Sequence, residues 1–263
     1  MDDKEINKLF VTINYYIHRS TTPSWTINGV NVDWPELLYV IKGQAEYKVN
    51  GVNFTVKKGD LLYSKKNSRR YAKTCQNDLM ECYSVSGPVY SADFDETVLP
   101  FPDITHVGIH EDIISMYKNL DSAWVTRNPG YELKARGIYM MILQRFFNLI
   151  HFKENENLYS IYVKKAIEHI IENFKDNLSV EAAAKKAGLS SSYFGSIFTK
   201  ETGFSYSQYL TNIRLNHAEN LLKSGEYNVN EAAWACGFSD PAYFSKLFKK
   251  ERGVPPSEIG RVR

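Results

Sequence analysis

The sequence predicts a two-domain α+β protein with a β-rich front half and an all-helical back half. Three observations lead to this prediction. The 263 residues exceed the size of one ordinary domain, since domains most often hold about 100 to 150 residues. Apolar residues recur near period two up to about residue 90 and at helical spacing after Asp103. The helical half also repeats itself at an interval of about 49 residues.

The front half contains short β-rich runs separated by turn residues, a pattern typical of a barrel or sandwich. The clearest feature is a hairpin, in which Asn50-Gly51 joins residues 44–49 to residues 52–57. Because Asn-Gly accepts positive φ at both central positions, we expect a type I′ turn. The remaining runs are residues 9–17, 37–41, 61–64 and 79–85.

Two helices are expected after the strands, at residues 113–120 and 133–150, where apolar residues follow helical spacing. A polar run at residues 153–157 indicates a linker, and the helical pattern resumes beyond it. The expected domains are a barrel over residues 1–105, a helical dimerisation and connector segment over 106–152, a linker over 153–158 and a helical domain over 159–263.

The repeat lies within the helical domain. Residues 183–190 match residues 232–239, and residues 193–203 match residues 243–253 after one extra residue in the second copy. Small alanines in the first part of each copy let a second helix cross closely. Each copy is therefore predicted to be a helix-turn-helix unit.

The turn and the second helix of each unit have distinct signals. Gly188 and Gly237 permit the left-handed turn that ends the first helix. Ser190 and Ser239 are expected to cap the second helix with their side-chain oxygens. Apolar residues at i, i+3 and i+4 form the buried stripe of that helix, namely Phe194, Ile197 and Phe198 in the first copy and Phe244, Leu247 and Phe248 in the second.

The opposite face of each second helix is left for DNA. Its residues are the candidate readers of base edges and phosphates. They are Ser192, Gly195, Ser196 and Thr199 in the first copy, and Pro241, Ala242, Ser245, Lys246 and Lys249 in the second.

These motifs resemble the AraC-type transcription regulators. The signature of that family's second unit stands complete between Gly237 and Pro256, and the resemblance covers residues 159–263. It implies seven helices, with residues 205–222 forming a long helix that holds the two units apart. At 1.5 Å per residue this helix spans about 27 Å, while successive major grooves on one face of DNA lie about 34 Å apart. One chain can therefore read two grooves.

The first unit departs from the family in its second helix. Many members carry an arginine or glutamine there, but this chain has Gly195-Ser196, which cannot make a long bidentate contact to guanine. Base readout is thus expected to depend more on the second unit. Gly195 serves either a close backbone approach to DNA or no purpose beyond being tolerated at the surface.

The front half resembles the family's cupin-like effector domain over residues 9–105. Metal-dependent cupins need several converging ligands, yet no histidine lies between His18 and His106. We therefore expect no metal, no cofactor and no enzyme activity. The three cysteines form no C-x-x-C pair, and no secretory leader or membrane span is visible, which favours the cytoplasm.

The resemblance implies an effector site at Trp34, Tyr71, Glu81 and Tyr83. Independently, Glu81 alternates with apolar residues on one strand, so its carboxylate should meet solvent, a ligand hydroxyl or Arg70. Aromatic rings beside a carboxylate suit a sugar-like molecule. The alternative is a barrel filled with its own aromatic side chains.

Together these features predict a sequence-specific regulator that binds double-stranded promoter DNA and responds to a small, sugar-like effector. The helix at residues 133–150 is expected to form a homodimer contact, because its apolar residues spread over more than one stripe. RNA polymerase is a further candidate partner, and no membrane is involved. In the alternative function, the barrel serves only dimerisation or protein contact and binds no small molecule.

Overall fold

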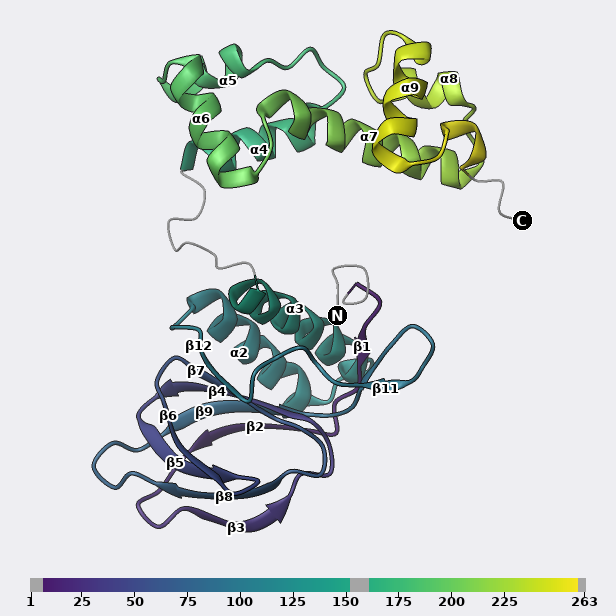
Figure 1. Ribbon diagram of the computed structural model, residues 1–263. Coiled ribbons are helices and arrows are strands. Elements are labelled where there is room, and N and C mark those ends of the chain that lie inside the picture. Colours follow the sequence, from purple (N-terminus) through teal and green to yellow (C-terminus); the bar gives the residue numbers. More distant parts are fainter. Residues whose placement is uncertain (1–6, 152–160, 260–263) are drawn as a thin grey trace. The chain divides into compact units, whose positions relative to one another are not determined.

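The computed structural model describes residues 7–151 and 161–259. Contacts between Cα atoms divide the chain into two compact units, Met1–Glu154 and Asn155–Arg263. The first unit holds all the described strands followed by two helices, and the second is helical (Figure 1). The predicted two-domain α+β class is therefore confirmed.

Three antiparallel sheets form the β-rich unit. One has the strand order β12-β7-β4-β9-β2, the second β3-β8-β5-β6 and the third β1-β10-β11, and among the described residues they do not close into one barrel. The strands are β1 (Phe10–Val11), β2 (Tyr15–Ser20), β3 (Thr26–Asn31), β4 (Glu36–Lys42), β5 (Gln44–Val49), β6 (Val52–Lys57), β7 (Asp60–Ser64), β8 (Arg69–Thr74), β9 (Glu81–Ser86), β10 (Val89–Tyr90), β11 (Glu96–Thr97) and β12 (Ile104–His106).

The predicted hairpin joins β5 to β6. Asn50 and Gly51 have φ values of 49° and 87°, as a type I′ turn requires, and Tyr47 lies opposite Phe54. The expected run at residues 9–17 is instead divided between two sheets, because β1 pairs with β10 while β2 pairs with β9.

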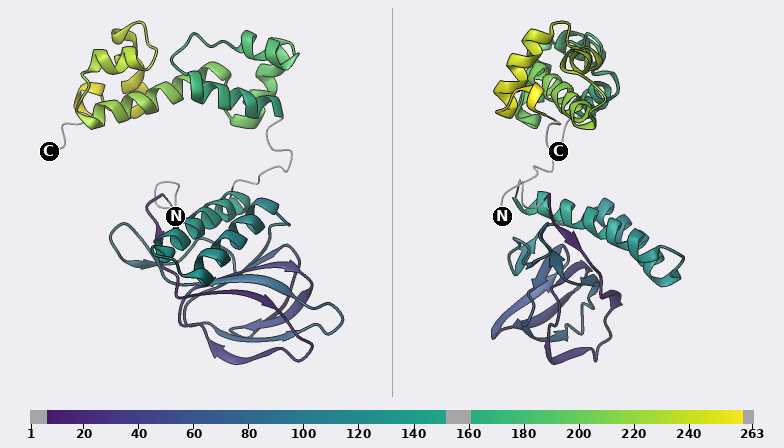
Figure 2. Two further views of the ribbon diagram at one scale, coloured as in Figure 1. Left: turned by 180° about the vertical axis from the view of Figure 1, so that it is seen from behind. Right: turned by 90° about the vertical axis from the view of Figure 1, so that its right-hand side faces the viewer.

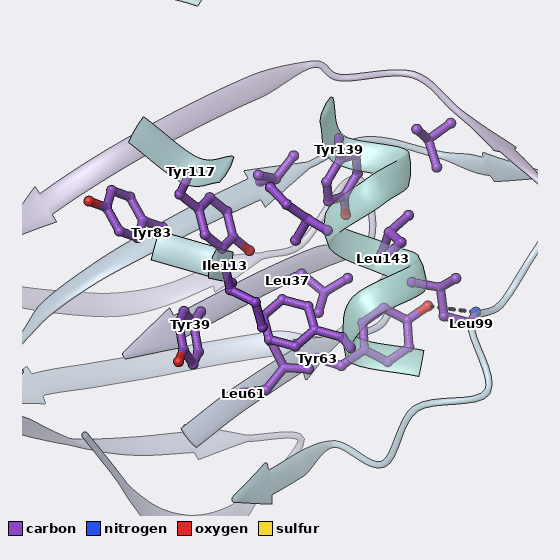
Figure 3. Close-up of a cluster of buried hydrophobic side chains, with 14 of the residues drawn as sticks. Leu37, Tyr39, Leu61, Tyr63, Tyr83, Leu99, Ile113, Tyr117, Tyr139 and Leu143 are labelled. Carbon is purple, nitrogen blue, oxygen red and sulfur yellow. Dashed lines mark hydrogen bonds between the residues drawn. The ribbon is translucent and has the colours of Figure 1, made fainter. Parts of the chain in front are cut away.

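The five-stranded sheet is buried on both faces. Leu38 and Val40 on β4 pack toward the four-stranded sheet, whereas Leu37 and Tyr39 pack toward α2 (Glu111–Thr126) and α3 (Tyr131–His151). Both helices lie along the same face of the strands (Figure 2). Figure 3 shows the tyrosine-rich core on this helix side. The unit thus has three layers, and alternate residues of β4 belong to different cores.

The helical unit has two cores, one for each copy of the repeat. The long helix α7 joins them, since Leu210 belongs to the first core and Leu215, Ala218 and Leu222 belong to the second. Between residues 161 and 259 the elements are α4 (Ile161–Asn173), α5 (Val180–Ala187), α6 (Ser191–Thr202), α7 (Tyr206–Ser224), α8 (Val229–Ala235), α9 (Pro241–Arg252) and the short 3₁₀ helix η1 (Pro256–Glu258).

Candidate nucleic-acid interface

The first helix-turn-helix unit consists of α5 and α6. Gly188 ends α5 with φ 69°, in the left-handed region, and the Ser190 hydroxyl then accepts a hydrogen bond from the backbone N–H of Tyr193 at 3.3 Å. Both features agree with the sequence-based prediction. They fix the angle at which α6 leaves α5.

The second unit, α8 and α9, turns in a slightly different way. Gly237 has φ 81° as expected, but the residue that caps α9 is Asp240 and not Ser239. The Asp240 carboxylate accepts from the backbone N–H of Ala242 at 2.8 Å, and Pro241 occupies the first turn. The extra residue in this copy moves the cap by one position. An aspartate cap followed by proline is a strong helix start.

The buried stripes of α6 and α9 are equivalent. Phe194 and Phe198 in α6, like Phe244 and Phe248 in α9, are fully buried in their respective cores. Each pair holds one face of its helix against the unit, which leaves the opposite face exposed.

On α6 the exposed face carries small hydroxyl side chains. Ser192, Ser196 and Thr199 are exposed, and the Thr199 hydroxyl donates to the Gly195 backbone oxygen at 2.8 Å. A Cβ added to Gly195 would meet only one side-chain atom of Val180, at 3.9 Å. The fold itself therefore does not require glycine at this position.

On α9 the exposed face carries cations. Ala242, Lys246 and Lys249 are exposed, while Pro241 and Ser245 are partly buried. The Ser245 hydroxyl donates to the Pro241 backbone oxygen at 2.9 Å. Within residues 161–259, neither Lys246 nor Lys249 forms a salt bridge. These ammonium groups are available for phosphate or guanine acceptors.

Sequence reasoning missed one pair of exposed residues on the two helices. Tyr193 and Tyr243 occupy matching positions in the first turns of α6 and α9, and each is 58% exposed. Each tyrosine precedes a buried phenylalanine, and consecutive helical residues point about 100° apart. That spacing was the signal that could have identified them. Large exposed rings with a hydroxyl belong to the same candidate face.

The four predicted effector residues do not all come together, although Glu81 and Tyr83 both contact His18. Tyr83 is buried on the helix side of the five-stranded sheet, where its ring stacks on Tyr117 with centroids 4.8 Å apart. Tyr71 is 39% exposed on the outer face of the four-stranded sheet, since its neighbours on β8, Arg70 and Ala72, face inward. Different layers of the unit hold these two rings.

The other two predicted effector residues have partners within the chain. The Lys66 ammonium lies 4.9 Å from the centroid of the Trp34 ring. The Glu81 carboxylate pairs with His18 at 2.9 Å, and not with the Arg70 donor considered for it. Strand alternation fixes which residues share a face but not which face lines the interior, and this is why the predicted set is divided.

Glu36 is a buried carboxylate of this unit that sequence reasoning did not single out. Its side chain is 1% exposed and accepts hydrogen bonds from Arg70 Nη1 at 2.7 Å, Tyr15 Oη at 2.7 Å and Ser84 Oγ at 2.5 Å. Burial lowers the pKa of the Arg70 guanidinium, but the Glu36 carboxylate together with Tyr47 and Tyr15 raises it, and the net shift of this pKa is upward. A lone acid beside the apolar run 37–41 was the available signal.

Further polar groups lie between the two large sheets. Arg19 Nη1, Arg70 Nε and the Tyr47 hydroxyl are buried without a hydrogen-bond partner among the described residues. Burial raises the pKa of Tyr47, so its hydroxyl remains a donor at neutral pH. The Trp25 ring lies beside this group, with its centroid 6.4 Å from that of Tyr47 and 5.3 Å from the Arg19 guanidinium carbon.

Within residues 7–151 and 161–259, no three histidine, cysteine, aspartate or glutamate side chains gather as a metal ion would require. His106 Nδ1 instead bonds the Asp60 carboxylate at 2.7 Å, and His110 Nε2 bonds the Val107 backbone oxygen at 2.6 Å. Over the same residues, each helix is too short or too polar to cross a membrane.

A family model described as a helix-turn-helix domain matches residues 183–261. An uncharacterised HTH-type transcriptional regulator, YijO of Escherichia coli, is 27% identical over 249 residues, which cover 88% of this chain and 82% of that protein. The Msm operon regulatory protein of Streptococcus mutans is 24% identical over 264 residues, covering 97% and 94%. The transcriptional regulatory protein YesN of Bacillus subtilis is 41% identical over 106 residues, covering 39% and 29%. The first two similarities extend through the β-rich unit.

Proposed function

The chain belongs to the AraC-type family of DNA-binding transcription regulators, and on that premise we propose that α6 and α9 read two successive major grooves of one promoter site. Its relatives are regulators and not enzymes. The observation that carries the proposal is the recurrence of one arrangement, a helix with a buried phenylalanine pair and an exposed polar face, at both ends of α7. The 19 residues of α7 span about 28 Å, close to one turn of DNA.

The two units have different roles in this proposal. Lys246 and Lys249 on α9 supply long cationic side chains that reach guanine acceptors or phosphates. On α6, the hydroxyl side chains of Ser192, Ser196 and Thr199 are short. They allow the DNA backbone to come close to this helix. Sequence discrimination is therefore concentrated in the element that α9 contacts.

Selection of binding sites from a randomised duplex library by the full-length chain tests this function. We expect an enriched site with two elements about one helical turn apart, and an affinity that falls steeply with salt as phosphate contacts release counterions. Enrichment of a single element, or of none, would contradict the two-groove proposal.

For the β-rich unit we propose a sensor of a small polar metabolite, with a sugar as the leading class. The supporting groups are the buried donors Arg19, Arg70 and Tyr47 and the neighbouring Trp25 ring, which suit hydroxyl oxygens and a sugar face. This moves the site from Trp34, Tyr71, Glu81 and Tyr83 to the interior between the sheets. The competing function is a unit that only mediates dimerisation.

We propose that a second copy of the chain covers one face of α3. Three of the apolar residues expected at this contact, Ile142, Phe146 and Phe147, are buried within the unit's own core. Met141, another of the expected residues, is 58% exposed and forms an exposed stripe with Gly137 and with Leu133, which is 71% exposed. It borders a groove of about 660 Å³ lined mainly by apolar residues, namely Phe10, Val11, Thr12, Tyr90, Phe94, Leu133, Arg136, Gly137 and Met140.

We also propose that the chain acts through RNA polymerase and is located in the cytoplasm. A regulator bound at a promoter acts through the polymerase that uses the same DNA, and it must occupy the compartment that holds that DNA.

A further inference from the structure

The loop between α4 and α5 contacts both helix-turn-helix units. Phe174, its first residue after α4, packs against the core of the first unit and also against the core of the second. Its ring stacks on His217 of α7, with centroids 4.0 Å apart and planes 5° from parallel. The two units are thus connected at a second place besides α7.

Arg214, near the middle of α7, ties this loop to the second unit. Its Nε donates to the Phe174 backbone oxygen at 2.7 Å, and its Nη2 donates to the Asp176 backbone oxygen at 2.8 Å. The same guanidinium carbon lies 5.8 Å from the centroid of Phe238, which follows the turn of the second unit. One half-buried side chain therefore joins the α4–α5 loop to the turn before α9.

The turn glycines of the two units differ in what surrounds them. A Cβ on Gly188 would meet nothing within 4 Å, whereas a Cβ on Gly237 would lie 2.6 Å from the Lys175 backbone oxygen and 2.9 Å from its Cα atom. Both glycines have positive φ, but only Gly237 touches the loop. The turn of the second unit therefore packs directly against the backbone of the α4–α5 loop.

We propose that Phe174, Arg214 and Gly237 form a brace that fixes the distance and rotation between α6 and α9, and so sets the spacing of the two DNA elements that one chain accepts. This proposal rests on the two-groove function above. One inserted base pair displaces the second element by about 3.4 Å and rotates it by about 35°. Two braced units cannot move to reach the displaced DNA element, whereas units joined by α7 alone can bend toward its new position.

The test measures the affinity of the full-length chain for the selected duplex and for versions with one base pair removed, one added and two added between the elements. We expect the wild type to lose about tenfold or more for each change, because one element then loses its base contacts. Arg214→Ala should bind the original spacing more weakly but lose less than about threefold on changing it. Lys223→Ala, which removes an exposed partner of Glu219 on the same helix, should keep the wild-type profile.

Gly237→Ala and Gly188→Ala form a second matched pair, because both strain a positive φ but only the first drives Cβ into Lys175. We expect only Gly237→Ala to broaden the spacing profile. Thermal melting checks that it folds, and if it does not, Arg214→Ala decides. If a two-element site is selected, but Arg214→Ala loses as much affinity as the wild type when the spacing changes, the brace is overturned and the proposed function is not. Failure to select any two-element site overturns the proposed function, and the brace with it.

Discussion

At the scale of single residues, the interior of the β-rich unit depends on the pair formed by Glu36 and Arg70. Three hydrogen bonds stabilise the carboxylate, and its arginine partner has a side chain only 8% exposed. Burying two charges costs much desolvation free energy. Removing one partner leaves the other charge buried and unpaired, which destabilises the fold more than replacing both residues by apolar ones. On the candidate DNA-binding faces of α6 and α9 we expect the reverse, because exposed side chains there add little to stability.

Arg70→Met should lower the free energy of unfolding by about 3 to 5 kcal/mol, because it leaves the Glu36 charge buried without its cation. Urea unfolding of the full chain, followed by a probe in the β-rich unit, measures the change. Lys65→Met is the control, since Lys65 and Asp103 form an exposed pair at 2.8 Å and such pairs contribute little. Similar small losses in both variants would refute a stabilising role for the buried pair.

Lys246→Ala should reduce discrimination between the selected site and random DNA more than Ser196→Ala does. A lysine on the exposed face of α9 reaches guanine acceptors, and a lost base contact is worth roughly 1 to 3 kcal/mol. Competition binding against both DNAs measures this. Lys250→Ala, beside Glu251 on the same helix, serves as the control. If Lys246→Ala weakened specific and random binding equally, Lys246 would be a phosphate contact.

At the scale of elements, α6, α9 and α3 each bury one side of the helix but differ in what the exposed side carries. In α6 and α9 a pair of buried phenylalanines leaves a polar face outside. In α3 the buried side is larger, and the outer face keeps an apolar stripe of Leu133, Gly137 and Met141. Gly137 has no side chain, so another helix could approach closely between the two exposed apolar residues. A second copy of α3 would then bury the stripe.

Met141→Glu should convert a dimer to a monomer at micromolar concentration, because it would bury a charge at the contact. Sedimentation velocity measures the change, and the circular dichroism spectrum should stay the same since Met141 is exposed. Lys48→Glu, at an exposed position on β5 in the four-stranded sheet, should leave the dimer intact. A wild-type chain that sediments as a monomer, with and without DNA, would rule out this interface.

At the scale of the whole molecule, each unit has its own hydrophobic cores. Each unit can therefore be examined separately for the activity proposed for it.

A fragment of residues 159–263 should fold and bind duplex DNA without the β-rich unit, because both of its cores lie within it. A mobility shift with the selected duplex at about 100 mM salt measures this, since phosphate attraction still operates there. A folded fragment that shifts neither the selected duplex nor random DNA would show that DNA binding needs the other unit.

A sugar panel screened by thermal shift should yield a ligand that stabilises the chain by about 2.7 kcal/mol at a hundredfold excess over its dissociation constant. Tyr47→Phe should lose most of that shift while the unliganded protein keeps its melting temperature, because the hydroxyl removed has no partner among the described residues. Tyr71→Phe, on the outer face, should keep the shift. The opposite pattern would restore the site predicted from sequence, and no shift with any compound would favour a dimerisation unit.

The sequence alone determined the features that depend on local order. Local patterns predicted the Asn50-Gly51 turn and the phenylalanine stripes of α6 and α9, because turn chemistry and helical periodicity act over a few positions. The 49-residue repeat was visible by comparing two segments of the sequence. The candidate DNA-reading faces followed from the same periodicity, and they remain predictions until DNA contacts are measured.

Only the tertiary structure decided which distant residues meet. Glu36 and Arg70 lie 34 positions apart, and strand alternation cannot say that both face the interior while Tyr71 faces out. The repeat likewise makes Gly188 and Gly237 equivalent, yet only Gly237 rests on Lys175. Such contacts arise from how sheets and helices stack after they form, and no periodicity in the sequence encodes them.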